Sequence, residues 1–124
     1  MRQIKWGKDI FYRGAASLPR TKPSYWSLDP RTAKSYARLR GGRVYKAVLT
    51  PHKIIQGSES DLAKHFRIAR KWVAERVRGH SGAGLRRASE LLYRTAEEKG
   101  YDVIVYSNQV VVLNPKIIHE INRR

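Results

Sequence analysis

Two apolar runs near the C-terminus are separated by only two polar residues. The runs are YDVIVY, over residues 101–106, and QVVVL, over residues 109–113, with Ser107 and Asn108 between them. Strand-forming runs joined by a two-residue turn predict a β-hairpin, and their nearly continuous apolar character predicts that it lies inside a sheet. The exception is Gln109, a polar amide that opens the second strand.

A short helix is predicted from Pro30 onward. The side chain of Asp29 can accept hydrogen bonds from the free N–H groups of the first turn, and Pro30 suits the first helical position, where no donor is needed. Gly41 and Gly42 mark the end of the helix. Helical spacing predicts an amphipathic helix in which Ala33, Tyr36 and Ala37 share a face, with Arg40 as a further candidate.

The rest of the chain alternates between extended and helical patterns. One long helix is expected between Ser58 and Gly79, followed by a loop over residues 80–84 and a second helix that ends at Gly100. The patterns typical of extended chain fall at residues 9–14, 43–50, 53–56 and 114–121. This order predicts a single α+β domain over residues 1–124, with a mixed, largely antiparallel sheet and helices from the central segment.

The composition is strongly basic. The chain has 26 Lys and Arg against 10 Asp and Glu, a net charge of +16. Such a field attracts phosphate backbones and acidic protein surfaces, so we expect an anionic macromolecule as partner, either a nucleic acid or an acidic or nucleic-acid-associated protein.

Several other classes of protein are disfavoured. The sequence contains no cysteine, and its four histidines show no metal-ligand spacing, so we expect no metal. No apolar run approaches the length of a membrane span or of a signal-peptide core. We therefore expect no membrane partner. The expected location is the cytoplasm, or the cytoplasm of a host or target cell reached by a route that the sequence does not reveal.

Three short segments, in the same order, resemble the ADP-ribosyltransferase fold, the family of NAD-dependent toxins and of poly- and mono-ADP-ribosyltransferases. FYRG, residues 11–14, is similar to the family's first core strand, where Arg or His precedes a small residue. SYWSLDPRTAKSYA, residues 24–37, is similar to its aromatic-Ser strand, acidic N-cap and Tyr-bearing helix. GYDVIVYSNQVVVLNPKII, residues 100–118, is similar to its C-terminal hairpin, in which the catalytic Glu opens a strand. The segments span nearly the whole chain.

The resemblance implies NAD as a substrate and assigns residues to its binding. Arg13 would help to hold the phosphate or ribose. Gly14 would let its backbone approach the nicotinamide amide closely, since a side chain would obstruct it. Trp26 and Tyr36 would flank the nicotinamide ring with their aromatic faces.

The resemblance also implies a catalytic group made of Arg13, Ser27 and the residue at the catalytic position, Gln109, which Ser27 would orient. Breaking the bond between nicotinamide and ribose develops positive charge on the ribose, which a carboxylate stabilises. Gln109 keeps the shape of a glutamate but offers a dipole instead of a full charge. The implied function is that of a mono-ADP-ribosyltransferase-like toxin or effector that modifies a nucleic acid or an associated protein.

Three explanations fit the glutamine. The protein binds its ligand without turnover, or it carries out another chemistry on the same fold, or the glutamine is an isosteric replacement for Glu. The RNA 2′-phosphotransferases resemble this fold and work without that glutamate, although their motifs are not matched here.

Alternatives to each assignment follow from the residues themselves. Buried aromatic residues are common, so Tyr12, Trp26 and Tyr36 could belong to the core. The helix predicted over 58–79 has a basic face, so the chain could be a nucleic-acid-binding module without catalysis. The residues assigned to that contact are Arg67, Arg70 and Lys71. A third alternative is a metal-independent ribonuclease that uses His65 or His80 as acid or base near Glu59 or Glu75.

Overall fold

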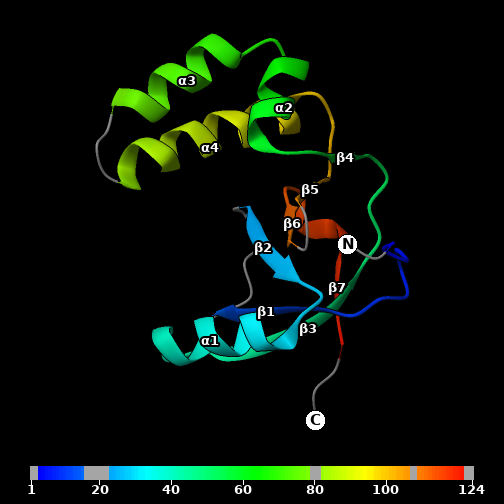
Figure 1. The fold of residues 1–124 in the computed structure, drawn as a ribbon. Coiled ribbons are helices and arrows are strands. Elements are labelled where there is room, and N and C mark those ends of the chain that lie inside the picture. The colour runs from blue at the N-terminus through cyan, green and yellow to red at the C-terminus, as the bar shows by residue number, and fades with distance from the viewer. Residues whose placement is uncertain (1–2, 16–22, 79–81, 107–108, 122–124) are drawn as a thin grey trace.

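Seven strands form one sheet, with helices packed near its two ends (Figure 1). The computed structural model describes residues 3–15, 23–78, 82–106 and 109–121. The strands are β1 (Phe11–Ala15), β2 (Ser24–Ser27), β3 (Arg43–Leu49), β4 (Ile54–Gln56), β5 (Val103–Tyr106), β6 (Gln109–Val112) and β7 (Ile118–Glu120). The helices are α1 (Pro30–Arg40), α2 (Glu59–His65), α3 (Ala69–Arg78), α4 (Gly82–Glu98) and the 3₁₀ turn η1 (Pro115–Ile117).

The sheet is mixed but largely antiparallel. Its strand order is β4-β5-β6-β2-β1-β3-β7, and only β4 and β5 run parallel. The α+β class and the helices from the central segment are therefore confirmed. The extended segments predicted near residues 53–56 and 114–121 form the two edge strands, β4 and β7.

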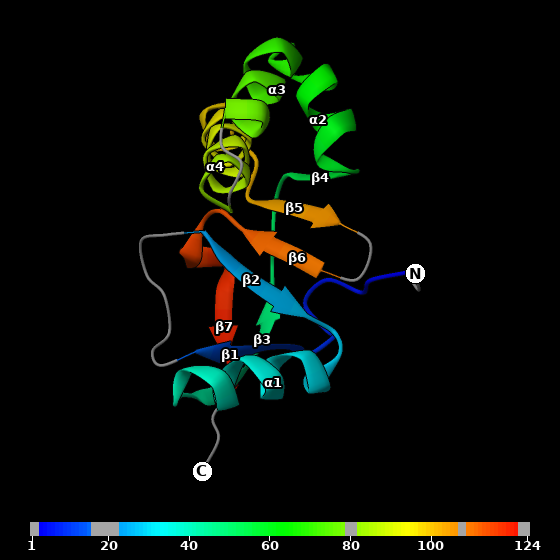
Figure 2. The same ribbon diagram turned by 60° about the vertical axis from the view of Figure 1, so that its left-hand side comes forward.

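Side chains alternate between two faces of the sheet because successive residues of a strand point in opposite directions. Trp26 and Val110 pack with Phe11 on one face, which we call the core face. Val111 points the other way and packs against residues of α2, α3 and α4, on what we call the helix face. Gly14 also lies on the helix face, under α1. Figure 2 shows α1 and the group α2–α4 at opposite ends of the sheet.

The predicted C-terminal hairpin is confirmed by the pairing of β5 with β6. Val105 lies opposite Val110, and Tyr106 lies opposite Gln109. Val110, Val111 and Val112 are at most 1% exposed, as expected for a strand inside the sheet. The connection at residues 107–108 lies outside the described residues.

Helix α1 begins and ends where the sequence predicts. Asp29 caps its N-terminus by accepting a hydrogen bond from the backbone N–H of Arg31, and Gly41 closes it in the left-handed conformation. Ala33 and Ala37 are buried, whereas Tyr36, predicted to share their face, is 47% exposed and lies at its edge.

The packing of α1 on the sheet depends on Gly14. A Cβ at this position would overlap the carbonyl oxygen of Ala33 and lie 2.6 Å from the backbone nitrogen of Ala37. The helix backbone therefore rests directly on β1, which no residue with a side chain would permit.

The single helix predicted between Ser58 and Gly79 is wrong, because the chain turns between α2 and α3. Arg67 adopts a positive φ of 60°. The N–H of Arg67 donates to the C=O of Lys64, and the N–H of Ile68 donates to the C=O of Ala63. This pair of bonds is the Schellman ending of a helix. Arginine stands where glycine is usual, so the break could not be predicted from the residues.

The loop predicted at residues 80–84 is shorter than expected, because α4 is helical from Gly82 onward. The three helices are joined by Glu59, at the start of α2. Its carboxylate accepts hydrogen bonds from the indole N–H of Trp72 on α3 and the hydroxyl of Ser89 on α4. Glu59 therefore fixes the helical group as one unit.

Asp102 joins the segment before β4 to the end of β6. Its carboxylate accepts hydrogen bonds from the backbone N–H groups of His52 and Lys53 and from the side-chain amide of Asn114. Burial acts to raise the pKa of Asp102, but these hydrogen bonds outweigh it, so the pKa lies below its ordinary value.

Gly14→Ala should strongly destabilise the protein. The added methyl group must push α1 off β1, and overpacking of this kind costs about 3 kcal/mol. Urea unfolding should show this loss, whereas Ser35→Ala, on the exposed side of the same helix, should change the free energy of unfolding by less than about 0.5 kcal/mol. Equal stability of Gly14→Ala and the wild type would contradict the close packing.

Arg67→Gly should stabilise the protein, because glycine adopts a positive φ without the steric penalty of a side chain. We expect a gain of about 0.5–1 kcal/mol in the free energy of unfolding. Arg67→Ala removes the same charge but keeps the Cβ, so it should give no gain. A gain of the same size in both variants would assign the effect to charge.

Asp102→Asn should lower the free energy of unfolding at pH 7 by about 2 kcal/mol, because the amide places a donor against two backbone donors. The wild type loses the same interactions as pH falls through the lowered pKa of Asp102. The difference between the two proteins should therefore shrink as pH falls from 3.8, the ordinary pKa of an aspartate, through the lowered pKa of Asp102, measured by urea unfolding across pH. A difference that does not change with pH would rule out the carboxylate as its source.

Candidate functional site

Five polar side chains form a continuous row across five neighbouring strands on the helix face. Tyr106 pairs with Gln109, Gln109 with Ser27, Ser27 with Tyr12, and Tyr12 with Lys46. Directly paired residues point to the same face, with Cβ atoms about 4.5–5.5 Å apart. The row therefore brings Ser27 and Gln109 together and adds three residues that the resemblance did not assign.

The row lies between the two groups of helices. Val111, two residues after Gln109, is covered by α2–α4, whereas Gly14, two residues after Tyr12, is covered by α1. Between them the row stays partly open: Lys46 is exposed, and Tyr12 and Gln109 are half-buried. A ligand that reaches this strip of sheet would meet hydroxyl, amide and ammonium groups.

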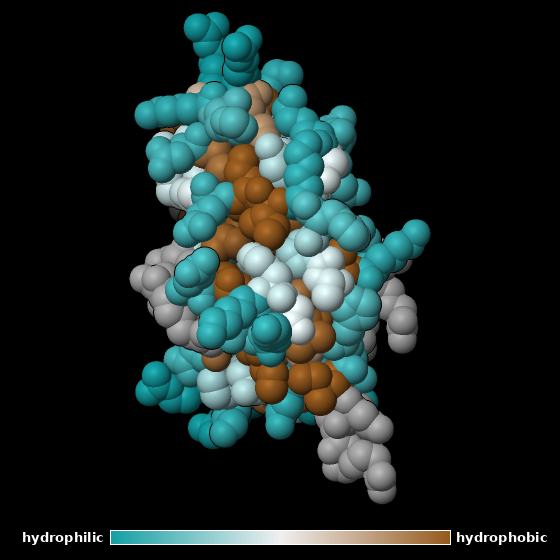
Figure 3. Space-filling view, turned by 90° about the vertical axis from the view of Figure 1, so that its right-hand side faces the viewer, coloured by the Kyte–Doolittle hydropathy of each residue, from teal (hydrophilic) through white to brown (hydrophobic). Residues whose placement is uncertain are grey.

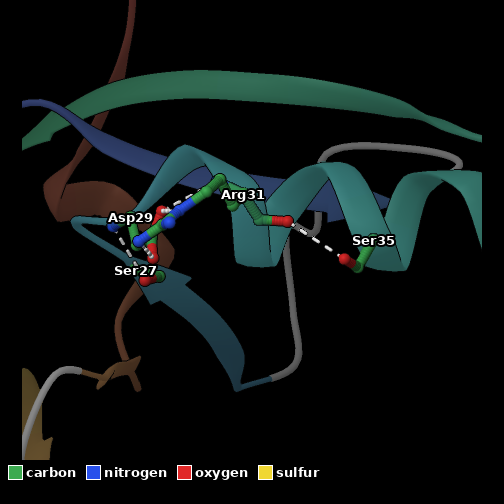
Figure 4. Close-up of polar contacts among 4 residues, drawn as sticks. All are labelled: Ser27, Asp29, Arg31 and Ser35. Carbon is green, nitrogen blue, oxygen red and sulfur yellow. Dashed lines mark hydrogen bonds and ion pairs between the residues drawn. The ribbon is translucent and has the colours of Figure 1, made fainter.

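Ser27 is held by the start of α1 (Figure 4). Its hydroxyl oxygen accepts a hydrogen bond of 3.0 Å from the backbone N–H of Asp29. The Ser27 hydroxyl forms no hydrogen bond with the Gln109 side chain, so the expected orienting contact is not formed. The hydroxyl proton of Ser27 is still available for donation, and the amide oxygen of its neighbour Gln109 is an acceptor.

Asp29 is committed to the end of the same helix. Its carboxylate accepts from the backbone of Arg31 and forms an ion pair of 3.1 Å with the guanidinium of that residue. The side-chain hydrogen bond from Arg31 is the main reason that the pKa of Asp29 is lowered. The Asp29 carboxylate therefore caps α1 and does not provide a free negative charge beside Gln109.

Arg13 is close to the row but on the other face of its strand. Because Tyr12 belongs to the row, alternation directs the next side chain to the core face. One guanidinium nitrogen of Arg13 donates to the carbonyl oxygen of Tyr25, at 3.2 Å. Arg13 thus contacts the backbone of β2 rather than lying beside Gln109.

Trp26 does not flank a ligand, and its assignment to the nicotinamide ring is wrong. Its side chain is 1% exposed within the core-face cluster, and its indole N–H donates to the hydroxyl of Ser24 at 2.8 Å. Neither face of the ring is open to solvent. The alternative that it belongs to the core is the correct one.

Gly14 and Tyr36 also differ from their assigned roles. The side of Gly14 on which a Cβ would stand is filled by the backbone of α1, so close approach there serves the helix instead of a ligand. Tyr36 is half-exposed on α1, the helix that covers β1, and is not part of the row. Two of the three residues assigned to the catalytic group, Ser27 and Gln109, do lie side by side in the row.

A group of tyrosines at the β5 end of the row was missed. The hydroxyl groups of Tyr25 and Tyr93 lie 3.1 Å apart and share a hydrogen bond. Burial raises the pKa of Tyr93 and of Tyr106 well above the ordinary value, so both stay neutral. Along β2, Ser24 and Trp26 lie on the core face, and Tyr25 and Ser27 lie on the helix face. This period of two is the signal that could have identified Tyr25.

The basic residues assigned to nucleic acid lie on the helical group. Arg67, Arg70 and Lys71 are exposed at the α2–α3 turn and on α3. Lys71 lines a groove of about 360 Å³ between α3 and α4. This groove also contains Glu75, which is bound by Arg87 at 3.1 Å and by Arg78 at 3.5 Å.

The two carboxylates named for ribonuclease chemistry, Glu59 and Glu75, are engaged in other contacts. Both oxygens of Glu59 accept hydrogen bonds from other helices, and Glu75 is held by two arginines. The ring of His65 packs against Phe66. His80 lies outside the described residues.

The described residues contain neither a candidate metal site nor a helix that could span a membrane. They contain no group of three or more His, Cys, Asp or Glu side chains that could hold a metal ion. None of their helices has both the length and the apolar character needed to cross a membrane. In comparisons with known proteins, no family model, curated protein or solved structure matches this chain.

Proposed function

We propose that the row from Tyr106 to Lys46 is an NAD site, and that the domain has an ADP-ribosyltransferase-like fold. The observation that carries the proposal is the pairing of Ser27 with Gln109. These residues come from two separate segments that resemble that family, and an independent feature, the register of β2 against β6, makes them neighbours on one face. The start of α1 directly after Ser27 is the third part of the same pattern.

The residues of the row have the chemistry that such a ligand requires. The amide of Gln109 and the hydroxyl of Ser27 can bind ribose hydroxyl groups. Tyr12 and Tyr25 offer partly exposed rings for a planar group, in place of the buried Trp26. Lys46, at the other end of the row, is exposed and can contact a phosphate.

The proposed activity is mono-ADP-ribosyl transfer to a nucleic acid or a nucleic-acid-associated protein, and Gln109 limits it. The reaction needs negative charge near the ribose as its bond to nicotinamide breaks. The neighbouring groups do not supply that charge, because Tyr93 and Tyr106 are protonated and the charge of the Asp29 carboxylate is paired with Arg31. The chain as it stands should therefore bind NAD better than it turns NAD over.

Gln109→Glu should raise the rate of NAD hydrolysis on the order of 100-fold to 1000-fold, because it supplies a carboxylate at the position of developing charge. Gln109→Leu, of similar size but without an amide, is the matched control and should show no gain. Transfer from labelled NAD to the nucleic-acid and protein fractions of a lysate would identify the acceptor.

NAD binding should be measured in parallel by titration calorimetry, with Tyr12→Ala as a variant of the row. If the wild type binds no NAD at millimolar concentration and Gln109→Glu hydrolyses none, the assignment is wrong.

A nucleic-acid-binding module without catalysis is the second candidate. It is favoured by the net charge of +16 and by the exposed Arg67, Arg70 and Lys71. It requires binding that weakens as salt rises and that does not respond to substitutions at Gln109.

A further inference from the structure

The excess of positive charge lies at the α1 end of the molecule. The elements at that end, β1, α1 and β3, contain seven Lys and Arg within their bounds and no Asp or Glu. The helical segment over residues 59–98 contains nine Lys and Arg against six Asp and Glu. The positive charge of the predicted basic helix is therefore largely balanced by acidic residues of the same segment. The positive charge of β1, α1 and β3 has no acidic residue within these elements to balance it.

Helix α1 concentrates this charge on its outer side. It carries four Lys and Arg and no acidic residue. Ala33 and Ala37 face the sheet, so a rotation of about 100° per residue places Lys34 and Arg38 toward solvent. Both side chains are exposed, and neither forms an ion pair with a described residue. They are four residues apart and so lie about 6 Å apart along the helix axis.

The same outer side presents apolar groups that a solvated helix has no need to expose. Leu39 is 82% exposed and Tyr36 is 47% exposed. Helical rotation places them on one shoulder of the outer side, with Lys34 and Arg38 on the other. The face seen in Figure 3 also shows apolar residues, which gather along its middle with hydrophilic side chains around them.

An exposed aromatic ring with cations on the opposite shoulder of the same helix suits a single strand of nucleic acid lying across the helix better than it suits other anionic partners. Lys and Arg contact the phosphates, while the ring stacks on a base, which every nucleotide offers. In a duplex the bases are stacked inside and their faces are not available to a side chain on a helix surface. An acidic protein would match the cations but would leave the tyrosine ring without a planar partner.

We propose that the outer side of α1 binds single-stranded nucleic acid, with phosphates at Lys34 and Arg38 and a base stacked on Tyr36. The helix is a rigid platform because Gly14 lets its backbone rest on β1 and Asp29 caps its start. Binding stands independently of the NAD site, whereas a role of the strand as acceptor rests on the proposed function.

The test compares variants of the full chain by fluorescence anisotropy with labelled oligouridine and oligothymidine at several salt concentrations. Lys34→Ala with Arg38→Ala should lower affinity about tenfold or more and reduce the slope of log affinity against log salt by about 1.4, as expected for two lost phosphate contacts. Tyr36→Ala should lower affinity about tenfold and leave the slope unchanged. The RNA and DNA probes show which sugar is preferred.

Arg70→Ala with Lys71→Ala is the matched control, since it removes the same charge from α3, and it should change neither quantity. An equal or larger loss in this control would overturn the proposal, as would binding that is tighter to a duplex of the same sequence or that ignores Tyr36→Ala. Thermal unfolding of each variant verifies that the fold is kept. Binding by Gln109→Glu should match the wild type, so failure of the NAD assignment would leave this result standing.

Discussion

The pairing of β2 with β6 holds the two halves of this domain together. It is the one place where the strands of the N-terminal part, β1, β2 and β3, meet the C-terminal hairpin. Its register matters as much as its existence, because a slip of one residue would turn every side chain of β2 to the opposite face. Trp26 would then leave the core face, and Ser27 would leave the row. The stability of the core and the composition of the site thus depend on the same backbone hydrogen bonds.

The fold was predictable where local chemistry decides the structure. Asp29, Pro30 and Gly41 define α1 because each satisfies a backbone requirement of a helix end. The break at Arg67 could not be predicted, because the left-handed position is occupied by a residue that carries no signal for it. The role of Gly14 also could not be predicted, since it depends on a helix that packs on the strand from elsewhere in the chain.

The site was predictable only in part, for a related reason. Gln109 stood out as a polar residue before an apolar run, and Ser27 as part of a short motif. Trp26 was misassigned because a strand of four residues can be read with either face inward, and only the pairing with β6 decides which. Lys46 and Tyr106 join the row through strand order, which a single sequence does not contain. The net positive charge could be read from the sequence, but its distribution over the surface could not. Which charges are balanced depends on which helices pack together.

The strand order also determines when the site can exist during folding. The β5–β6 hairpin and the α1–β3 unit are local structures, but β2 must find β6 across a long stretch of intervening chain, and closing such a loop is slow and entropically unfavourable. Ser27 and Gln109 therefore become neighbours only when β2 pairs with β6, after the chain between them has folded back. The row is absent from any partly folded chain, and ligand binding at the row would report on completion of the entire domain rather than on either half.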